Sequence, residues 1–171
     1  KKLYNYYALQ GGYKWDTKYG EGNVRIYGFK TNKKFPDWQE TKKKARKGWG
    51  LSFDQEIIKD LVGIFARFGY QDDSAQISYK SMYEIGLNSN FCILNKKITW
   101  GLGYAFLKAP SKHEDLKKSQ IIETYLAIPI YQWDNKISST LSFDWQYVKD
   151  FLKEEKDKRG NVWGVRLNLA F

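Results

Sequence analysis

Cysteine and histidine are nearly absent from this chain: its 171 residues include one of each, Cys92 and His113. A single cysteine excludes a disulfide within the chain, and the two residues offer no Cys/His cluster for a structural metal ion. We therefore interpret both as bystander residues. Long hydrophobic runs are missing as well, since no stretch approaches the ~18 apolar residues of a transmembrane helix, and the mean hydropathy is −0.65.

Aromatic residues, in contrast, are abundant: seven Trp, thirteen Tyr and ten Phe make up 18% of the chain. This content exceeds what an ordinary small core requires, although the mean hydropathy is low. Together with 14 Gly, it favours a β protein whose strands have one apolar and one polar face.

The formal charge is +10, which is a reason to consider nucleic-acid binding. The lysines, however, gather in three polar segments, near residues 31–48, 108–120 and 149–160. Runs of charge are usually solvated loops, and acidic residues interrupt two of these three. We therefore predict long polar loops at these places and no nucleic-acid partner.

Segments in which apolar and polar residues alternate recur along the whole chain and are bounded by turn residues, which predicts β-strands. Nine such segments cover residues 3–15, 23–30, 49–57, 61–71, 77–91, 97–108, 121–133, 136–148 and 161–171. Most are about ten residues long, whereas strands of globular proteins have about 5–6 residues. A tilted strand needs ~9–11 residues to cross a bilayer. We therefore expect an all-β chain, an antiparallel transmembrane β-barrel of the outer-membrane type, in a single domain covering residues 1–171.

The connections support the same fold class. "QEIIKDL" and "QWDNK" join neighbouring strands with few residues to spare, whereas the three Lys-rich segments are long. Short turns on one rim and long loops on the other are typical of outer-membrane barrels.

The last strand illustrates the two faces. Trp163, Val165 and Leu167 alternate with smaller or polar residues, among them Arg166. Within such apolar rows, aromatic residues tend to stand at the strand ends, as Trp163 and Phe171 do. This order predicts the aromatic girdles of a membrane barrel, although large rings could also fill the core of a sandwich.

The polar rows carry charged residues in the middle of the strands, where an arginine facing lipid would cost ~2–4 kcal/mol. These residues must therefore face water, in a lumen or outside a soluble sheet. Tyr125 and Tyr27 could stack on sugar rings if they point inward. The candidate pore-lining residues are Arg25, Asp54, Arg67, Glu84, Glu123, Tyr125, Asp144 and Arg166. For each charge, a structural salt bridge is as good an interpretation as a solute contact.

Several pieces resemble the carbohydrate-selective porins of the OprB type: "GWGLSFDQEIIKDLVGIFARFGYQDD", "ITWGLGYAFLKAPSKHED", "IIETYLAIPI", "DWQYV" and "NVWGVRLNLAF". They occur in the family's order and cover residues 48–171. The resemblance implies a 16-stranded porin that passes sugars by facilitated diffusion without a cofactor. It also implies that Arg67, Glu84, Glu123 and Arg166 match polar residues of lumen-facing rows.

An odd number of strands is unusual, because bacterial single-chain barrels use an even number. Either one segment is not a membrane strand and the barrel is a complete eight-stranded one, or the chain is the C-terminal portion, with about eight or nine strands, of a larger barrel. The start of the chain within a predicted strand favours the second possibility.

We therefore expect an outer-membrane porin, or part of one, of the Gram-negative type. Its expected partners are sugars or small solutes in the lumen, lipid around the barrel, and lipopolysaccharide at loop lysines such as Lys42, Lys43 and Lys44; a homo-oligomer is possible. One alternative is an eight-stranded adhesin or lipid-modifying enzyme, another a soluble β-sandwich binder. Enzyme activity is not expected, because His113 has Ser111 nearby but no evident triad partner.

Overall fold

The computed structural model describes residues 4–94, 96–133 and 137–170, and it contains only strands as regular structure. All nine predicted strands are confirmed. They are β1 (Tyr6–Thr17), β2 (Gly20–Pro36), β3 (Lys43–Ile58), β4 (Val62–Gln71), β5 (Ser81–Ile93), β6 (Lys96–Lys108), β7 (Leu116–Trp133), β8 (Ile137–Leu152) and β9 (Lys158–Ala170).

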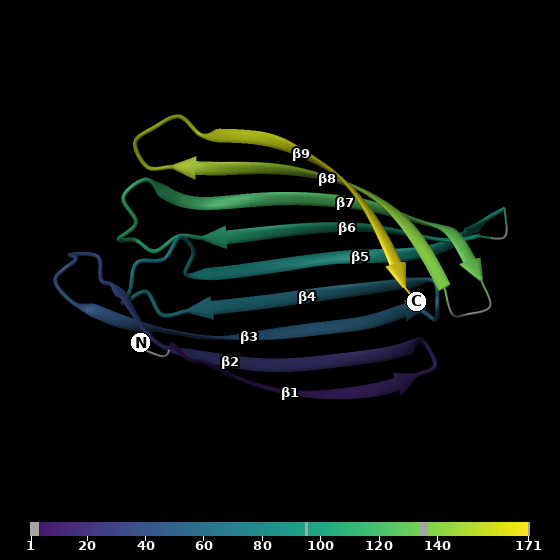
Figure 1. Ribbon diagram of the computed structural model, residues 1–171, viewed down its shortest axis with the longest axis horizontal. Coiled ribbons are helices and arrows are strands. Elements are labelled where there is room, and N and C mark those ends of the chain that lie inside the picture. The colour runs from purple at the N-terminus through teal and green to yellow at the C-terminus, as the bar shows by residue number, and fades with distance from the viewer. Residues whose placement is uncertain (1–3, 95, 134–136, 171) are drawn as a thin grey trace.

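The nine strands form one antiparallel sheet in which each strand pairs with the next one in sequence, from β1 to β9 (Figure 1). The expected antiparallel all-β architecture is therefore present. The sheet is not closed: β1 pairs only with β2, and β9 pairs only with β8.

The connections alternate in length along the whole chain. Loops 37–42, 72–80, 109–115 and 153–157 lie at one end of the sheet, which we call the long-loop rim. The turns at residues 18–19 and 59–61 lie at the opposite end, the short-turn rim. The predicted turn within "QWDNK" falls at residues 134–136, outside the described residues.

The three predicted loops are shorter than expected, because the strands continue into them. Lys30 is paired with Lys47, Phe35 with Lys44, and Asp150 with Lys158. Ladder hydrogen bonds join backbone groups, so lysine side chains at a strand end do not prevent pairing as long as they reach water. The lysine clusters therefore lie mainly at the solvated ends of long strands and only partly in the loops.

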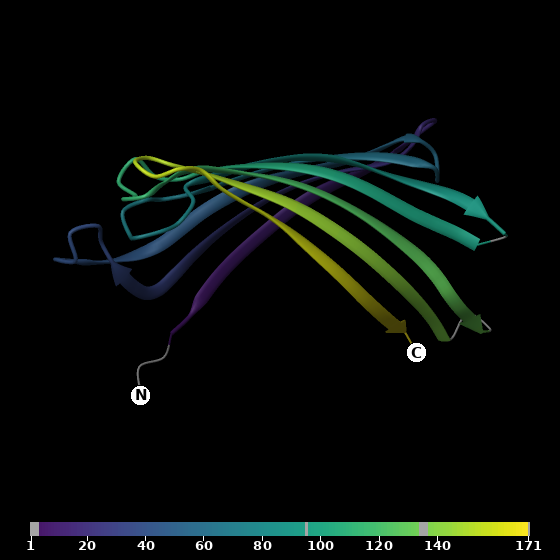
Figure 2. The same ribbon diagram turned by 90° about the horizontal axis from the view of Figure 1, so that it is seen from above.

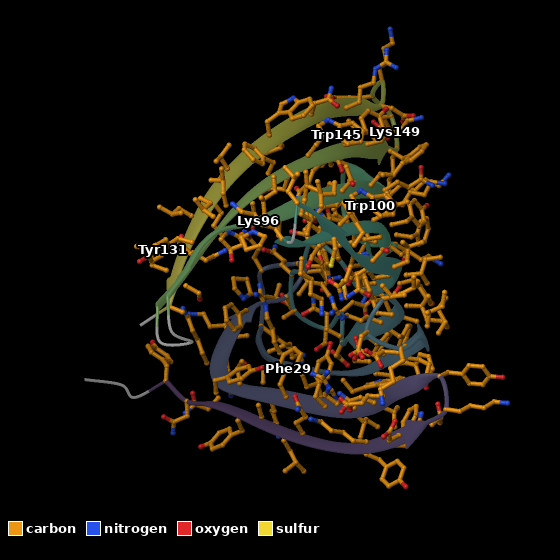
Figure 3. All side chains as sticks on the ribbon, turned by 90° about the vertical axis from the view of Figure 1, so that its right-hand side faces the viewer. Phe29, Lys96, Trp100, Tyr131, Trp145 and Lys149 are labelled. Carbon is orange, nitrogen blue, oxygen red and sulfur yellow. The ribbon has the colours of Figure 1, made fainter. Side chains whose placement is uncertain are left out.

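The sheet is strongly arched (Figure 2). Viewed approximately along the strands, it forms an arc that is open on one side, with Phe29 on the inner side (Figure 3). The register places Arg25, Ser52, Arg67 and Glu84 in one row across β2–β5, and these residues belong to the concave face. The residues between them in sequence belong to the convex face.

The convex face is apolar and open to the surroundings. Ile85 is 60% exposed, Phe143 43% and Leu102 39%, although all three lie in central parts of their strands. The buried apolar side chains of the described residues are only Ala75, Ile77, Ile98, Ala109 and Pro110. Trp100, Leu141 and Leu167 thus share no interior between two layers, because the described residues form a single sheet. Nor do those residues include a helix long and apolar enough to span a membrane.

Aromatic rings form a cluster on the convex face near the long-loop rim, where Phe68 lies 5.0 Å from Trp49 and 5.0 Å from Tyr83, measured between ring centroids. Towards the short-turn rim, the ring of Trp15 lies 6.0 Å from that of Phe53. The middle is mixed, because Phe53 and Tyr104 stand in the same row as Ile85. Phe171, predicted to close one band, lies outside the described residues.

On the concave face, large rings lie over glycines of neighbouring strands. A Cβ atom added to Gly101 would collide with the ring of Tyr125, and one added to Gly86 would collide with Phe65. Gly101 and Tyr125 are register partners in β6 and β7. The missing side chain makes room for the ring, so the aromatic residue packs flat against the wall.

This packing predicts that Gly101→Ala destabilises the sheet, because the ring of Tyr125 must leave its place. We expect the free energy of unfolding in detergent to fall by about 1–3 kcal/mol, as for other overpacked sites. The matched control is Gly11→Ala, since a Cβ at Gly11 meets nothing within 4 Å. Equal stability of the two variants in denaturant titrations would contradict the packing role of Gly101.

Candidate functional site

All eight predicted site residues lie on the concave face. The register joins Arg25, Ser52, Arg67 and Glu84 in one row, and it joins Asp54, Phe65 and Glu123 in the next row through the glycines of β5 and β6. Tyr125 and Asp144 are partners in a third row, and Arg166 is paired with Ser142 on β9. The alternation of the sequence thus identified their common face correctly.

A hollow of about 700 Å³ occupies the middle of the concave face. Six of the eight predicted residues line it: Arg25, Asp54, Arg67, Glu84, Glu123 and Tyr125. Asp144 and Arg166 are not part of this lining and lie farther along the arc, on β8 and β9. The hollow is therefore built by β1–β7, and its wall continues onto the last two strands.

Two cross-strand ion pairs stand in this hollow. Arg25 Nη2 lies 3.2 Å from Asp54 Oδ2, and Arg67 Nη1 lies 3.5 Å from Glu84 Oε2. In both pairs the arginine side chain is the more exposed partner, with 44% against 35% for the first and 46% against 24% for the second. Both pairs are therefore partly solvated.

The two arginines differ in their other contacts. The guanidinium carbon of Arg67 lies 4.7 Å from the centroid of the Phe65 ring, within the range of a cation–π contact. The Arg25 Nε atom is buried without a hydrogen-bond partner. Arg25 therefore keeps one N–H donor that the described protein atoms do not use.

The acidic side of the hollow is arranged differently. Glu123 Oε2 accepts a hydrogen bond of 2.9 Å from the side-chain amide of Gln146. Asp144 lies over Gly164, where an added Cβ would collide with its carboxylate. Glycine again provides the space that a polar side chain on the next strand occupies.

Charges of both signs are interspersed on the concave face. Lys14, Arg25 and Arg67 come from β1, β2 and β4, and Glu84, Glu123 and Asp144 come from β5, β7 and β8. Glu21, Asp54 and Glu56 also line the hollow, on β2 and β3, and Arg166 lies on β9. Charges of opposite sign on neighbouring strands set up local electric fields, which water screens only partly near a low-dielectric wall.

The β4–β5 loop, residues 72–80, crosses the long-loop rim; we call it the rim strap. On one side, the Gln76 amide donates to the Pro36 carbonyl, and the Trp38 indole donates to the Asp73 carbonyl at 2.7 Å. On the other side, the Lys80 amide donates to the carbonyl of Lys108. The strap thus joins the ends of β2 and β6.

Further contacts attach the strap deeper in the arc. The Tyr79 hydroxyl lies 2.9 Å from Ser119 Oγ, and Ser119, which is fully buried, donates in turn to Asp150 on β8. Arg46 Nη2 donates to the Gln76 carbonyl at 2.7 Å. Ser119 and Arg46 belong to rows of the concave face, so the strap lies on the concave side of the rim.

Sequence reasoning missed the strap. The predicted strand over residues 77–91 begins only at Ser81, because Ile77 and Tyr79 belong to the loop and point into its small buried cluster. Their alternation resembles that of a strand. The polar run Asp72, Asp73 and Ser74 was the only local signal for a long connection at this place.

His113 makes two contacts at the long-loop rim. Its Nδ1 atom accepts a hydrogen bond of 3.1 Å from the Leu116 amide, and its ring centroid lies 6.0 Å from that of Trp38. Cys92 is exposed. Within the described chain, no three His, Cys, Asp or Glu side chains come together as a possible metal site.

Two groups of the strap and one group of the β2–β3 loop have shifted pKa values. Hydrogen bonds from Ser74 hold the pKa of the Asp72 carboxyl below its ordinary value of 3.8. The Asp73 carboxylate, 3.0 Å from Lys80 Nζ, raises the pKa of Lys80 above its ordinary value of 10.5. In the β2–β3 loop, the backbone amides of Lys42 and Thr41 lower the pKa of Asp37.

Comparisons of the chain with family models, with curated proteins and with solved structures gave no match.

Because the pKa of Asp72 is lowered and that of Lys80 is raised, the strap should keep its structure through the neutral pH range. The contribution of Asp72 is present above pH 3.8 and is lost as the pH falls through its lowered pKa; that of Lys80 is complete below pH 10.5 and is lost as the pH rises through its raised pKa. Asp72→Asn should reduce the protection of the Ser74 amide against hydrogen exchange at pH 7, and the difference from wild type should vanish in acid. Glu154→Gln, an exposed change in another loop, serves as control, and an unchanged Ser74 amide in Asp72→Asn would contradict this role.

Proposed function

We propose that this chain forms part of the wall of a β-barrel pore in an outer membrane, along whose concave face small polar solutes, carbohydrates among them, diffuse passively. The observation that carries the proposal is the contrast between the two faces. One is apolar and uncovered, and the other bears all eight predicted polar or aromatic site residues, six of which line a hollow of about 700 Å³.

The apolar face requires a partner medium. A soluble domain would bury such a face against a second layer, since burial of apolar area is worth about 25 cal/mol per Å². The described residues form one layer, and Leu9 and Val165 are 82% and 70% exposed near its two edges. Acyl chains would cover the face from β1 to β9 without a second layer, and the aromatic rings near the rims would lie at the level of the lipid headgroups.

The open edges also support a wall that is completed by other strands. Because nine is odd, β1 and β9 run in the same direction, from the long-loop rim to the short-turn rim. Closure by antiparallel pairing therefore takes an odd number of additional strands. A second copy in the same orientation would place its β1 parallel to β9, which outer-membrane barrels avoid.

Solutes would pass between the rim strap and the charged hollow. The charges of the wall would orient dipolar molecules, and the flat rings of Tyr125 and Phe65 would offer stacking surfaces to pyranose rings. No covalent step is needed, because diffusion through water-filled space requires neither nucleophile nor cofactor. Solutes would meet both members of each ion pair, because arginines and carboxylates alike are partly exposed.

Lipid contacts at the rims belong to the same proposal. Lys42, Lys43 and Lys44 lie exposed around the β2–β3 connection at the long-loop rim. The ammonium groups of these lysines at the long-loop rim would pair with the phosphates of lipopolysaccharide. Assembly of several copies, if it occurs, would use the outside of closed barrels rather than the strand edges.

The membrane assignment predicts opposite results for two neighbouring residues of β8. Phe143 lies on the convex face and Ser142 on the concave face. Phe143→Lys should cost ~2–4 kcal/mol of stability in lipid and prevent insertion into vesicles, whereas Ser142→Lys should insert normally. Equal insertion of both variants, or a wild-type chain that remains soluble without detergent, would contradict the proposal and favour a soluble binder.

The pore assignment predicts channels in planar bilayers when the chain is present in its complete barrel. Oligosaccharides should reduce the current by occupying the hollow. Tyr125→Ala should weaken this block, whereas Tyr125→Phe, which retains the ring over Gly101, should preserve it. Absence of any channel would contradict the pore function. An equally strong block by oligosaccharide in wild type and in Tyr125→Ala would contradict the role of this ring.

A further inference from the structure

The β6–β7 loop, residues 109–115, lies at the long-loop rim, and several of its contacts involve His113. Within the loop, the His113 amide donates to the Pro110 carbonyl, and the Leu116 amide donates to the imidazole Nδ1 at 3.1 Å. Towards the β2–β3 loop, the imidazole meets the edge of the Trp38 indole. The indole in turn donates to the rim strap at Asp73. One imidazole therefore stands where three loops meet.

The charge state of this imidazole decides whether it can make its hydrogen bond. Nδ1 accepts from the Leu116 amide only while it carries a lone pair, which places the proton of the neutral ring on Nε2. A second proton would convert Nδ1 into a donor that faces another N–H group. Histidine is the side chain that ordinarily changes its charge between pH 5 and 8, and His113 is the only one in the chain.

The surrounding charges come from four loops. Lys112, Glu114 and Asp115 are neighbours within the loop. Lys153 of the β8–β9 loop donates through Nζ to the carbonyl oxygens of His113 and Ser111. Glu40 and Arg46 line the same cavity of about 640 Å³ as His113, Glu114 and Asp115, and Asp73 lies beyond Trp38. His113 therefore stands among charges of both signs.

The rim strap and the β6–β7 loop therefore differ in how acid affects them. The strap is held by ion pairs and hydrogen bonds whose carboxylate Asp72 has a lowered pKa. The β6–β7 loop is held by the Lys153 ammonium, which donates to the Ser111 and His113 carbonyls, and by the hydrogen bond from the Leu116 amide to the imidazole. Of these contacts, only the imidazole acceptor is lost when the ring takes up a proton.

We propose that His113 is a proton-operated latch: the neutral ring accepts the Leu116 amide and ties the end of the β6–β7 loop to β7, and protonation of the ring breaks this hydrogen bond. Its loss leaves the strap in place and loosens the junction of the loop with β7 beside the cavity of about 640 Å³. The consequence for solute passage rests on the proposed pore function, whereas the loss of the hydrogen bond does not.

Hydrogen exchange of the Leu116 amide, corrected for the intrinsic rate at each pH, tests the latch in the full chain in detergent. Loss of one hydrogen bond of ordinary net strength should lower its protection by about fivefold at pH 5 relative to pH 8, while the Ser74 amide of the strap keeps its protection. His113→Asn places an oxygen acceptor near the position of Nδ1 and cannot titrate in this range. It should keep Leu116 protected at both pH values, whereas His113→Ala should leave it unprotected at both.

Lys112→Gln is the control for neighbouring charge and should behave as wild type. Equal protection of Leu116 at pH 5 and 8 in wild type, or a pH response that persists in His113→Asn, would overturn the proposal. In bilayers, wild-type channels should change their conductance between pH 8 and 5, and those of His113→Asn should not. Absence of channels would count against the pore alone, because the exchange measurement decides the latch independently.

Discussion

The agreement of register across all strands is the constraint on which the two-faced sheet depends. Side chains alternate with a period of two, so a shift of one residue in any strand would move its charges to the apolar side. Such a slip in β4 would place Arg67 beside Ile85 and Phe53 instead of beside Glu84. The ion pair between Arg67 and Glu84, 3.5 Å apart, thus also specifies how β4 and β5 align.

Strand direction and loop length follow from the same meander. Each strand reverses the chain, so every second connection returns to the same rim, and long connections gather at one end. Only that rim has enough chain to fold back over the concave face. Ala75, Ile77 and Ala109 are buried there, and this small cluster gives the long-loop rim a structure of its own.

The sequence was sufficient for the features that depend on alternation. It predicted nine strands and the common face of Arg25, Asp144 and the other candidates, because a period of two is visible in each segment alone. It did not predict the strap, the ring of Tyr125 over Gly101 or the contact between His113 and Trp38. These features join residues from different connections or strands, and a single segment carries no signal for a partner that lies 24 or 75 positions away.

Stability alone gives a poor reason for the charged hollow. Half-exposed ion pairs such as Arg25–Asp54 contribute between ~0 and 1 kcal/mol, and Arg25 Nε gains no hydrogen bond from its burial. Apolar or small residues at these positions would fold into the same sheet with at least equal stability. The charges therefore have their clearest consequence outside the protein, in the local fields that they impose on water and solutes above the concave face.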